Sequence, residues 1–286
     1  MLFRSDVVMV LAGTYTENVT IGKAVDVRGP NFNISPNTGT RVAEAVLRPA
    51  VTNTSTGAVV TITSSNASFR GFTVDGDNTS LAASGYGLGG AYGTSIDAAR
   101  GIFVNADGVT GITVADNITK NAVNGIRLEQ TTNFFPTNAA AVRSYGITVT
   151  NNRVENVTGT GIRLGNSMFA KVTNNTIVNA ENGIAFSSFR ISDAGNAADR
   201  VVSGNTITAR YAGIWTNLYH SSPYAISNNT ISVAPAAPTN NTASIAPRTT
   251  VPAGGTGSSG SGTRTMSSPR RASTIRVWMP PHRSTP

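Results

Sequence analysis

Five positions that each follow a Gly-Ile pair hold the side chains best suited to bind a ligand. In a strand whose Ile126 and Leu128 point inward, Arg127 points outward, and the other four positions share this register. A guanidinium suits carboxylate or sulfate groups, and a Trp ring suits the face of a sugar. Stacked on one another, these positions predict a binding groove, with a plain solvated face as the alternative. They are Phe103, Arg127, Arg163, Ala185 and Trp215.

Glu129 is the only outward carboxylate that the pattern places near these positions. A single carboxylate beside an arginine can act as the base of a polysaccharide lyase, or form a surface ion pair. Glu129 and Arg127 are therefore the catalytic candidates. Insertions flank the groove, and Tyr219, four residues after Trp215, extends the predicted binding surface.

The segment Asp75-Gly76-Asp77-Asn78 could supply oxygen ligands to Ca²⁺. Two carboxylates around a glycine are also ordinary turn chemistry. Asp75 and Asp77 are thus the candidate metal ligands, and the sequence predicts no other cofactor.

The elements that position these residues come from a repeat in the middle of the chain. Segments of the form strand, Asn turn, strand, Gly-Ile strand recur from Ile112 onward. The distance from the turn Asn to the next Gly-Ile glycine is 8, 9, 8 and 8 residues. The return to the next Asn varies, which places insertions at one corner of a solenoid. We expect the glycine of each Gly-Ile pair to let a strand begin after a tight bend.

The turn asparagines are expected to stack as a ladder of hydrogen-bonded amides. We also expect each of them to adopt the left-handed backbone that turns the chain between strands. The predicted ladder consists of Asn117, Asn152, Asn175, Asn205 and Asn229.

Alternating apolar residues in these segments bury one side chain in two, and no coil can bury that face alone. The sequence therefore predicts an all-β chain, a right-handed parallel β-helix of three sheets and roughly seven coils over residues 7–233. Residues 234–286 are rich in Pro, Ser, Gly and Arg without apolar periodicity, so we expect a disordered tail.

Charge and composition exclude several classes of protein. The net charge is +8, but the last 40 residues hold six Arg and no acid, so the basicity belongs to the tail and nucleic-acid binding is not predicted. No cysteine is present, which excludes disulfides and thiol nucleophiles. No apolar run is long enough to span a membrane. No pattern indicates an oligomeric state.

The Asn turn followed by Gly-Ile resembles the repeat of the pectin lyase-like right-handed β-helix superfamily. The opening Gly13, Tyr15 and Glu17 are similar to the Gly-x-Tyr-x-Glu of pectin methylesterases. That family's catalytic stretches have no counterpart in this chain. The resemblance also implies hydrolases with adjacent aspartates and a Gly-His-Gly, and neither His220 nor His282 has that context.

We therefore expect a bacterial-type module, extracellular or on the cell surface, that is structural or binds acidic polysaccharide. The alternatives are a polysaccharide lyase or glycoside hydrolase acting on an acidic glycan, and a segment of an adhesin-type rod. We expect both natural ends, with any signal peptide, to be missing from this chain.

Overall fold

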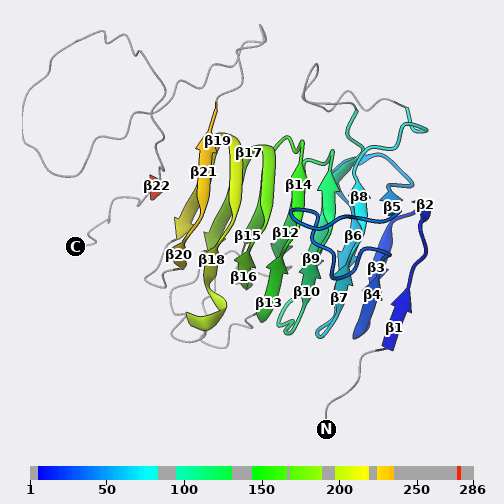
Figure 1. Cartoon of the computed structure of the whole chain (residues 1–286), viewed down its shortest axis with the longest axis horizontal. Coiled ribbons are helices and arrows are strands. Elements are labelled where there is room, and N and C mark those ends of the chain that lie inside the picture. The colour runs from blue at the N-terminus through cyan, green and yellow to red at the C-terminus, as the bar shows by residue number, and fades with distance from the viewer. Residues whose placement is uncertain are drawn as a thin grey trace, which may run out of the picture.

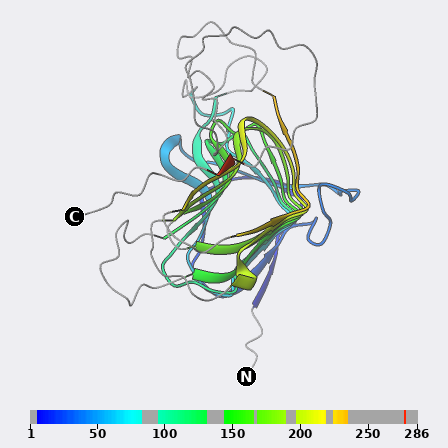
Figure 2. The ribbon, with the colours of Figure 1, turned by 90° about the vertical axis from the view of Figure 1, so that its left-hand side faces the viewer.

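The computed structural model describes residues 6–82, 95–130, 144–165, 168–188, 197–218, 224–234 and 276–277. Regular structure in these residues is β-strand, apart from one 3-10 helix, η2 (Ala197–Asp199). Every strand pair is parallel. The strands lie side by side along the long axis, and a view along that axis shows them superimposed around one core (Figures 1 and 2).

Three parallel faces wind around this core. The first sheet contains β1 (Asp6–Met9), β4 (Val25–Arg28), β7 (Ser68–Arg70), β10 (Thr113–Ala115), β13 (Ser144–Thr150), β16 (Met168–Thr173), β18 (Val201–Ser203) and β20 (Ala225–Ser227). The second contains β2 (Gly13–Thr16), β5 (Ala45–Arg48), β8 (Thr73–Asp75), β11 (Ile118–Lys120), β14 (Arg153–Glu155), the first parts of β17 (Thr176–Ser188) and β19 (Thr206–Leu218), and β21 (Thr230–Val233).

The third sheet contains β3 (Val19–Ile21), β6 (Asn53–Ile62), β9 (Ala98–Asn105), β12 (Asn124–Glu129), β15 (Thr160–Gly165), the second parts of β17 and β19, and β22 (Arg276–Val277). Because β17 and β19 run through the corner between the second and third sheets, their hydrogen bonds join these two faces. This arrangement confirms the predicted right-handed parallel β-helix of three sheets.

The core is built from columns of equivalent side chains. One column runs through the third sheet, where the isoleucine after each Gly is at most 1% exposed. Since neighbouring coils pair in register, Ile126, Ile162 and Ile184 each pack between equivalent isoleucines on both sides. This burial is the main force that holds the coils together. The column consists of Ile102, Ile126, Ile162, Ile184 and Ile214.

The corner between the first and second sheets contains the asparagine ladder. Each Nδ2 group donates to the Oδ1 of the next asparagine, at 3.1, 3.0, 3.0 and 2.8 Å along the series. Each Nδ2 also donates to a backbone carbonyl of the coil before it, as Asn175 does to Val149 at 2.9 Å. The ladder residues are Asn117, Asn152, Asn175, Asn205 and Asn229, and Asn117 accepts a final bond from the Phe72 amide at 3.0 Å.

The expectation that the ladder residues themselves are left-handed is wrong. The residue before each of them has the positive φ, between 54° and 67°. That preceding residue makes the turn, and the ladder asparagine then aims its amide into the corner. The left-handed residues are Asp116, Asn151, Asn174, Gly204 and Asn228.

The reason we expected for the Gly-Ile glycines is also wrong. None of Gly101, Gly125, Gly161, Gly183 and Gly213 is among the residues with positive φ. A Cβ on Gly161 would instead lie 2.6 Å from Ile177 Cγ2 and 2.8 Å from the Gly183 carbonyl oxygen. Glycine is needed at these positions because the next coil, packed against them, leaves no room for a side chain.

The segment between β4 and β5 forms a strap along the ladder corner (Figure 2). The Asn33 amide donates to Asp116 Oδ2 at 3.0 Å, and Arg41 Nη1 donates to the Asp116 carbonyl at 2.8 Å. Asn37 Nδ2 donates to the carbonyl oxygens of Asn152 and Asn174 at 3.3 and 3.1 Å. The strap therefore binds one early coil to later ones more than 100 residues along the chain.

Two residues of the predicted disordered tail are part of a sheet, since β22 pairs with Trp215 and Thr216 of β19. Residues 235–275 and 278–286 lie outside the described residues, so disorder of the tail stays a prediction.

Candidate functional site

The third sheet brings the predicted column together. Arg127 is the parallel partner of both Phe103 and Arg163, and Ala185 is the partner of Arg163 and of Trp215. The strands that carry them, β9, β12, β15, β17 and β19, are successive neighbours in the stack (Figure 1). Successive members are therefore one strand spacing apart, about 4.8 Å.

Phe103 does not present a free ring face, because Arg100 covers it. The Arg100 Cζ atom lies 4.3 Å from the ring centroid, and the Arg127 Cζ atom lies 6.0 Å from it. Phe103 is 8% exposed in consequence. This geometry is a cation–π contact, in which the negative ring face helps to hold a half-desolvated guanidinium.

Sequence reasoning missed Arg100. It lies three residues before Phe103, ahead of the Gly-Ile pair that marks the repeat, so the outward register does not include it. Its Nη1 group donates to the carbonyl oxygen of Thr56 on the preceding coil, which folds the side chain back over the ring. Only this tertiary contact reveals that Arg100 belongs to the site.

Arg127 and Glu129 form an ion pair on β12, and their side chains are 16% and 15% exposed. Alternation along the strand places both on the outer face, two residues apart. Arg127 Nε is buried without a hydrogen-bond partner in the described structure. The predicted catalytic candidates are thus in contact with each other, and the carboxylate is engaged by a guanidinium.

Arg163 is half-buried, and no hydrogen bond or ion pair to its guanidinium occurs within the described residues. Burial lowers the pKa of Arg163, the positive charge of Arg127 lowers it further, and Glu129 opposes the shift. The pKa of Arg100 is lowered by burial first, then by Arg127, with smaller effects of Glu129 and Arg163. Both shifts reflect first the burial of the guanidinium groups and then the positive charge of Arg127 beside them.

We call Arg100, Phe103, Arg127, Glu129 and Arg163 the arginine cluster. Its three guanidinium groups and one carboxylate carry a net charge of +2, and among the described residues Glu129 is the only carboxylate that influences the pKa of Arg100 or Arg163. A desolvated cation without a counter-ion is costly, so a cluster with this excess of positive charge can accept an anionic ligand.

The rest of the predicted column is less open than expected. Ala185 is 3% exposed, and Trp215 is half-buried. Trp215 is the parallel strand partner of Arg276 on β22. Tyr219 lies outside the described residues, as do most residues of the insertions at this corner.

The candidate calcium ligands are engaged by the protein. Asp75 Oδ1 accepts a hydrogen bond from Asn121 Nδ2 at 2.8 Å, and Asp75 Oδ2 lies 3.5 Å from Lys120 Nζ. Asp77 is 6% exposed, and its backbone amide donates to Asp75 at 3.3 Å. In the described ranges no group of three or more His, Asp or Glu side chains is arranged to hold a metal ion. Calcium binding stays a prediction.

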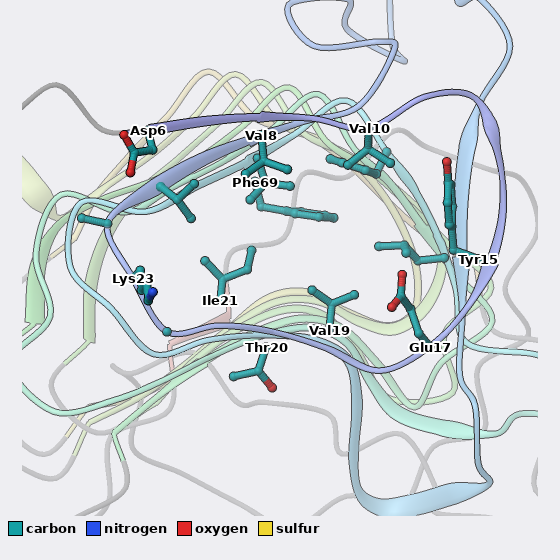
Figure 3. A pocket seen from close by; sticks show the side chains of 16 residues that line it. Asp6, Val8, Val10, Tyr15, Glu17, Val19, Thr20, Ile21, Lys23 and Phe69 are labelled. Carbon is teal, nitrogen blue, oxygen red and sulfur yellow. The ribbon is translucent and has the colours of Figure 1, made fainter.

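A cavity of about 740 Å³ opens at the N-terminal end of the core, within the first coils (Figure 3). Val8, Val19 and Ile21 line its interior, and Asp6, Tyr15, Glu17 and Lys23 lie around it. It is the end of the hydrophobic core, where β1, β2 and β3 have a neighbouring coil on one side only. The arginine cluster is part of later coils and is separate from this cavity.

No helix among the described residues is long and apolar enough to cross a membrane. The prediction that the chain has no membrane-spanning helix therefore holds for that part of the chain.

Comparisons with known proteins concern the fold. No curated protein matches the sequence. A solved structure described as pectin methylesterase in complex with hexasaccharide VII is 14% identical, with a TM-score of 0.35 over 75% of this chain and 74% of that chain. A second, the Dettilon tailspike protein (gp208), is 14% identical, with a TM-score of 0.30 over 80% of this chain and 55% of that chain.

One family profile also matches the chain, over residues 133–276, which is half of its length. The matched segment includes β13 to β21 and therefore the later coils of the solenoid. The chain belongs to the family described as "Protein of unknown function (DUF1565)", and its fold is a right-handed parallel β-helix.

Proposed function

We propose that this protein is an extracellular or cell-surface β-helix module that binds acidic polysaccharide through the arginine cluster. The observation that carries the proposal is the grouping of three arginines, Arg100 buried and Arg127 and Arg163 half-buried, around one described carboxylate, Glu129. A protein surface that served only as a scaffold gains nothing from this charge, since desolvation of each guanidinium costs stability.

The geometry of the column supports a polymeric ligand. Arg127 and Arg163 recur at the strand spacing of about 4.8 Å, which is close to the length of one sugar in an extended chain. The planar guanidinium of Arg163, which has no counter-ion within the described residues, suits carboxylate or sulfate by paired hydrogen bonds. Trp215, two coils beyond Arg163, can hold a sugar ring by its face regardless of charge.

Binding is favoured over catalysis because of how Glu129 is held. Its carboxylate is paired with Arg127, and the arginine cluster contains no second carboxylate to complete an acid–base pair. A lyase that uses Glu129 as its base is the second candidate. Such an enzyme would release unsaturated sugars, which absorb in the ultraviolet, and Glu129→Gln would abolish that signal.

The experiment is a glycan array probed with the full chain, followed by titration of the bound glycans at several salt concentrations. We expect binding to uronic or sulfated glycans that weakens as salt screens the charges. Arg127→Ala/Arg163→Ala should weaken acidic binding by at least about tenfold, since hydrogen bonds between charged groups contribute about 1.5–3 kcal/mol each. Neutral glycans should lose less.

The matched control is Arg153→Ala, which removes an arginine that is paired with Glu155 on the second sheet. Acidic binding should be unchanged in this variant, because Arg153 lies on another face of the helix. An array without acidic hits, or equal binding by the wild type and the double variant, contradicts the proposed function.

A further inference from the structure

The three arginines of the cluster come from three successive coils, and their charges are not equivalent. Arg100 is held over the ring of Phe103, which is the register partner of Arg127, and Arg163 is the partner of Arg127 on the next coil. Successive strands are about 4.8 Å apart, so the strands that carry Arg100 and Arg163 are separated by roughly 10 Å along the rod.

The middle arginine already has its anion. Arg127 is paired with Glu129, whereas Arg163 has no counter-ion within the described residues and Arg100 donates to a neutral backbone carbonyl. The cluster therefore presents two unneutralised cations that flank a neutralised one. An extended polyanion that follows the column would meet the positive charge of Arg100, then the neutral Arg127–Glu129 pair, then the positive charge of Arg163.

We infer that Glu129 determines ligand specificity, and that the cluster selects polysaccharides with an acidic group on every second sugar over those charged on every sugar. This inference rests on the proposed function and concerns the same site. Acidic groups on alternate sugars recur about every two strand spacings, which matches the separation of Arg100 and Arg163. The uncharged sugar between them then lies over the Arg127–Glu129 pair.

A polymer charged on every sugar meets a penalty at the middle position. Its central carboxylate either approaches Glu129 at close range or displaces it from Arg127. The first outcome sets two like charges side by side in a half-desolvated site, and the second breaks an ion pair whose side chains are 16% and 15% exposed. Glu129 thus acts as a built-in competitor for the middle arginine.

The test compares two polymers by titration of the full chain: hyaluronate, with one carboxylate for every two sugars, and polygalacturonate, with one on every sugar. We expect the wild type to bind hyaluronate at least about tenfold more tightly. Glu129→Gln should strengthen polygalacturonate binding by about tenfold or more and thereby remove the preference. Glu155→Gln on the second sheet is the control and should leave the preference intact.

Glu129→Gln leaves Arg127 without a partner and could disturb folding, so a second variant removes both members of the pair. Arg127→Gln/Glu129→Gln removes the pair and keeps the net charge of the cluster at +2. It retains both outer arginines, so hyaluronate binding should persist, while discrimination against polygalacturonate should fall. Far-ultraviolet circular dichroism and thermal unfolding show whether each variant is folded.

The outcomes separate this inference from the function on which it rests. Equal binding of the two polymers by the wild type, or a preference that both folded variants retain, overturns the role of Glu129 and leaves acidic-glycan binding standing. Binding to neither polymer while other acidic glycans bind also overturns this inference alone. Binding to no acidic glycan at all overturns both.

Discussion

The asparagine ladder and the arginine cluster are produced by the same stacking of coils, yet they treat polar groups in opposite ways. In the ladder, Asn175 donates to Asn205 Oδ1 at 3.0 Å and to the Val149 carbonyl at 2.9 Å, and it accepts two bonds from Asn152. In the cluster, Arg163 is half-buried without a described partner. At the ladder corner, stacking gives the asparagine amides hydrogen-bond partners. On the third sheet, it leaves an arginine without a described counter-ion, where an anionic ligand could bind.

This difference separates a stabilising role from a binding role. Buried polar groups that are fully hydrogen-bonded fix the register of the coils, because any shift would break several bonds at once. Unpaired half-buried cations lower the stability of the fold and gain a partner only when an anion binds. Substitutions in the two regions should therefore change stability in opposite directions.

The largest expected effect is in the ladder. Asn175→Leu should lower the free energy of unfolding by about 3–5 kcal/mol, since the Asn152 amide groups and the Val149 carbonyl lose partners inside the corner. Chemical denaturation of the full chain measures this loss. Thr208→Leu, on the exposed side of β19, is the control and should change stability little. Equal midpoints for the two variants would show that the ladder contributes nothing.

A smaller loss is expected in the backbone directly beneath the arginine cluster. Gly161→Ala should cost about 2–3 kcal/mol, because its Cβ would lie 2.6 Å from Ile177 Cγ2 and 2.8 Å from a backbone oxygen. At Gly22, in the first coil, a Cβ would meet only Thr63 Oγ1 at 3.7 Å, so Gly22→Ala is the control. If both variants unfold at the same denaturant concentration, close packing is not what selects glycine after all.

Sequence reasoning located the ladder and the column because both follow from a fixed spacing within each coil. The spacing of 8, 9, 8 and 8 residues is enough to identify which residues are equivalent, and equivalence in a solenoid means contact. It did not reveal which residue turns left-handed, since Asp116 and the ladder residue Asn117 are adjacent and both types tolerate that backbone.

The repeat pattern could not predict side-chain contacts between coils. Phe103 follows the outward register, yet its exposure depends on Arg100, which reaches it only because Thr56 of the preceding coil holds the guanidinium. The charge balance of the cluster could likewise not be read from the spacing. The charge balance depends on which arginine Glu129 contacts. Arg127 and Arg163 are register partners of each other, so the spacing alone does not show that Glu129 pairs with Arg127.

The smallest predicted effect has the opposite sign to the other two. Arg163→Met should raise the free energy of unfolding by about 1 kcal/mol, because the aliphatic part of the side chain is kept while a desolvated, uncompensated charge is removed. The same variant should bind acidic glycan less well. Thermal unfolding at low salt measures the gain, and added salt should reduce it by screening the repulsion from Arg127.

Arg70→Met is the matched comparison, because Arg70 is a half-buried arginine that does have a counter-ion. Its Nη2 group lies 2.6 Å from Asp26 Oδ2. Although burial raises the pKa of Asp26, hydrogen bonds from Arg70 and Arg28 hold it below its ordinary value, so this pairing stabilises the charged carboxylate. Arg70→Met should therefore destabilise the fold at neutral pH. If Arg163→Met and Arg70→Met both destabilise to the same extent, Arg163 is satisfied in the free protein, and the cluster is a part of the scaffold rather than a site that awaits an anion.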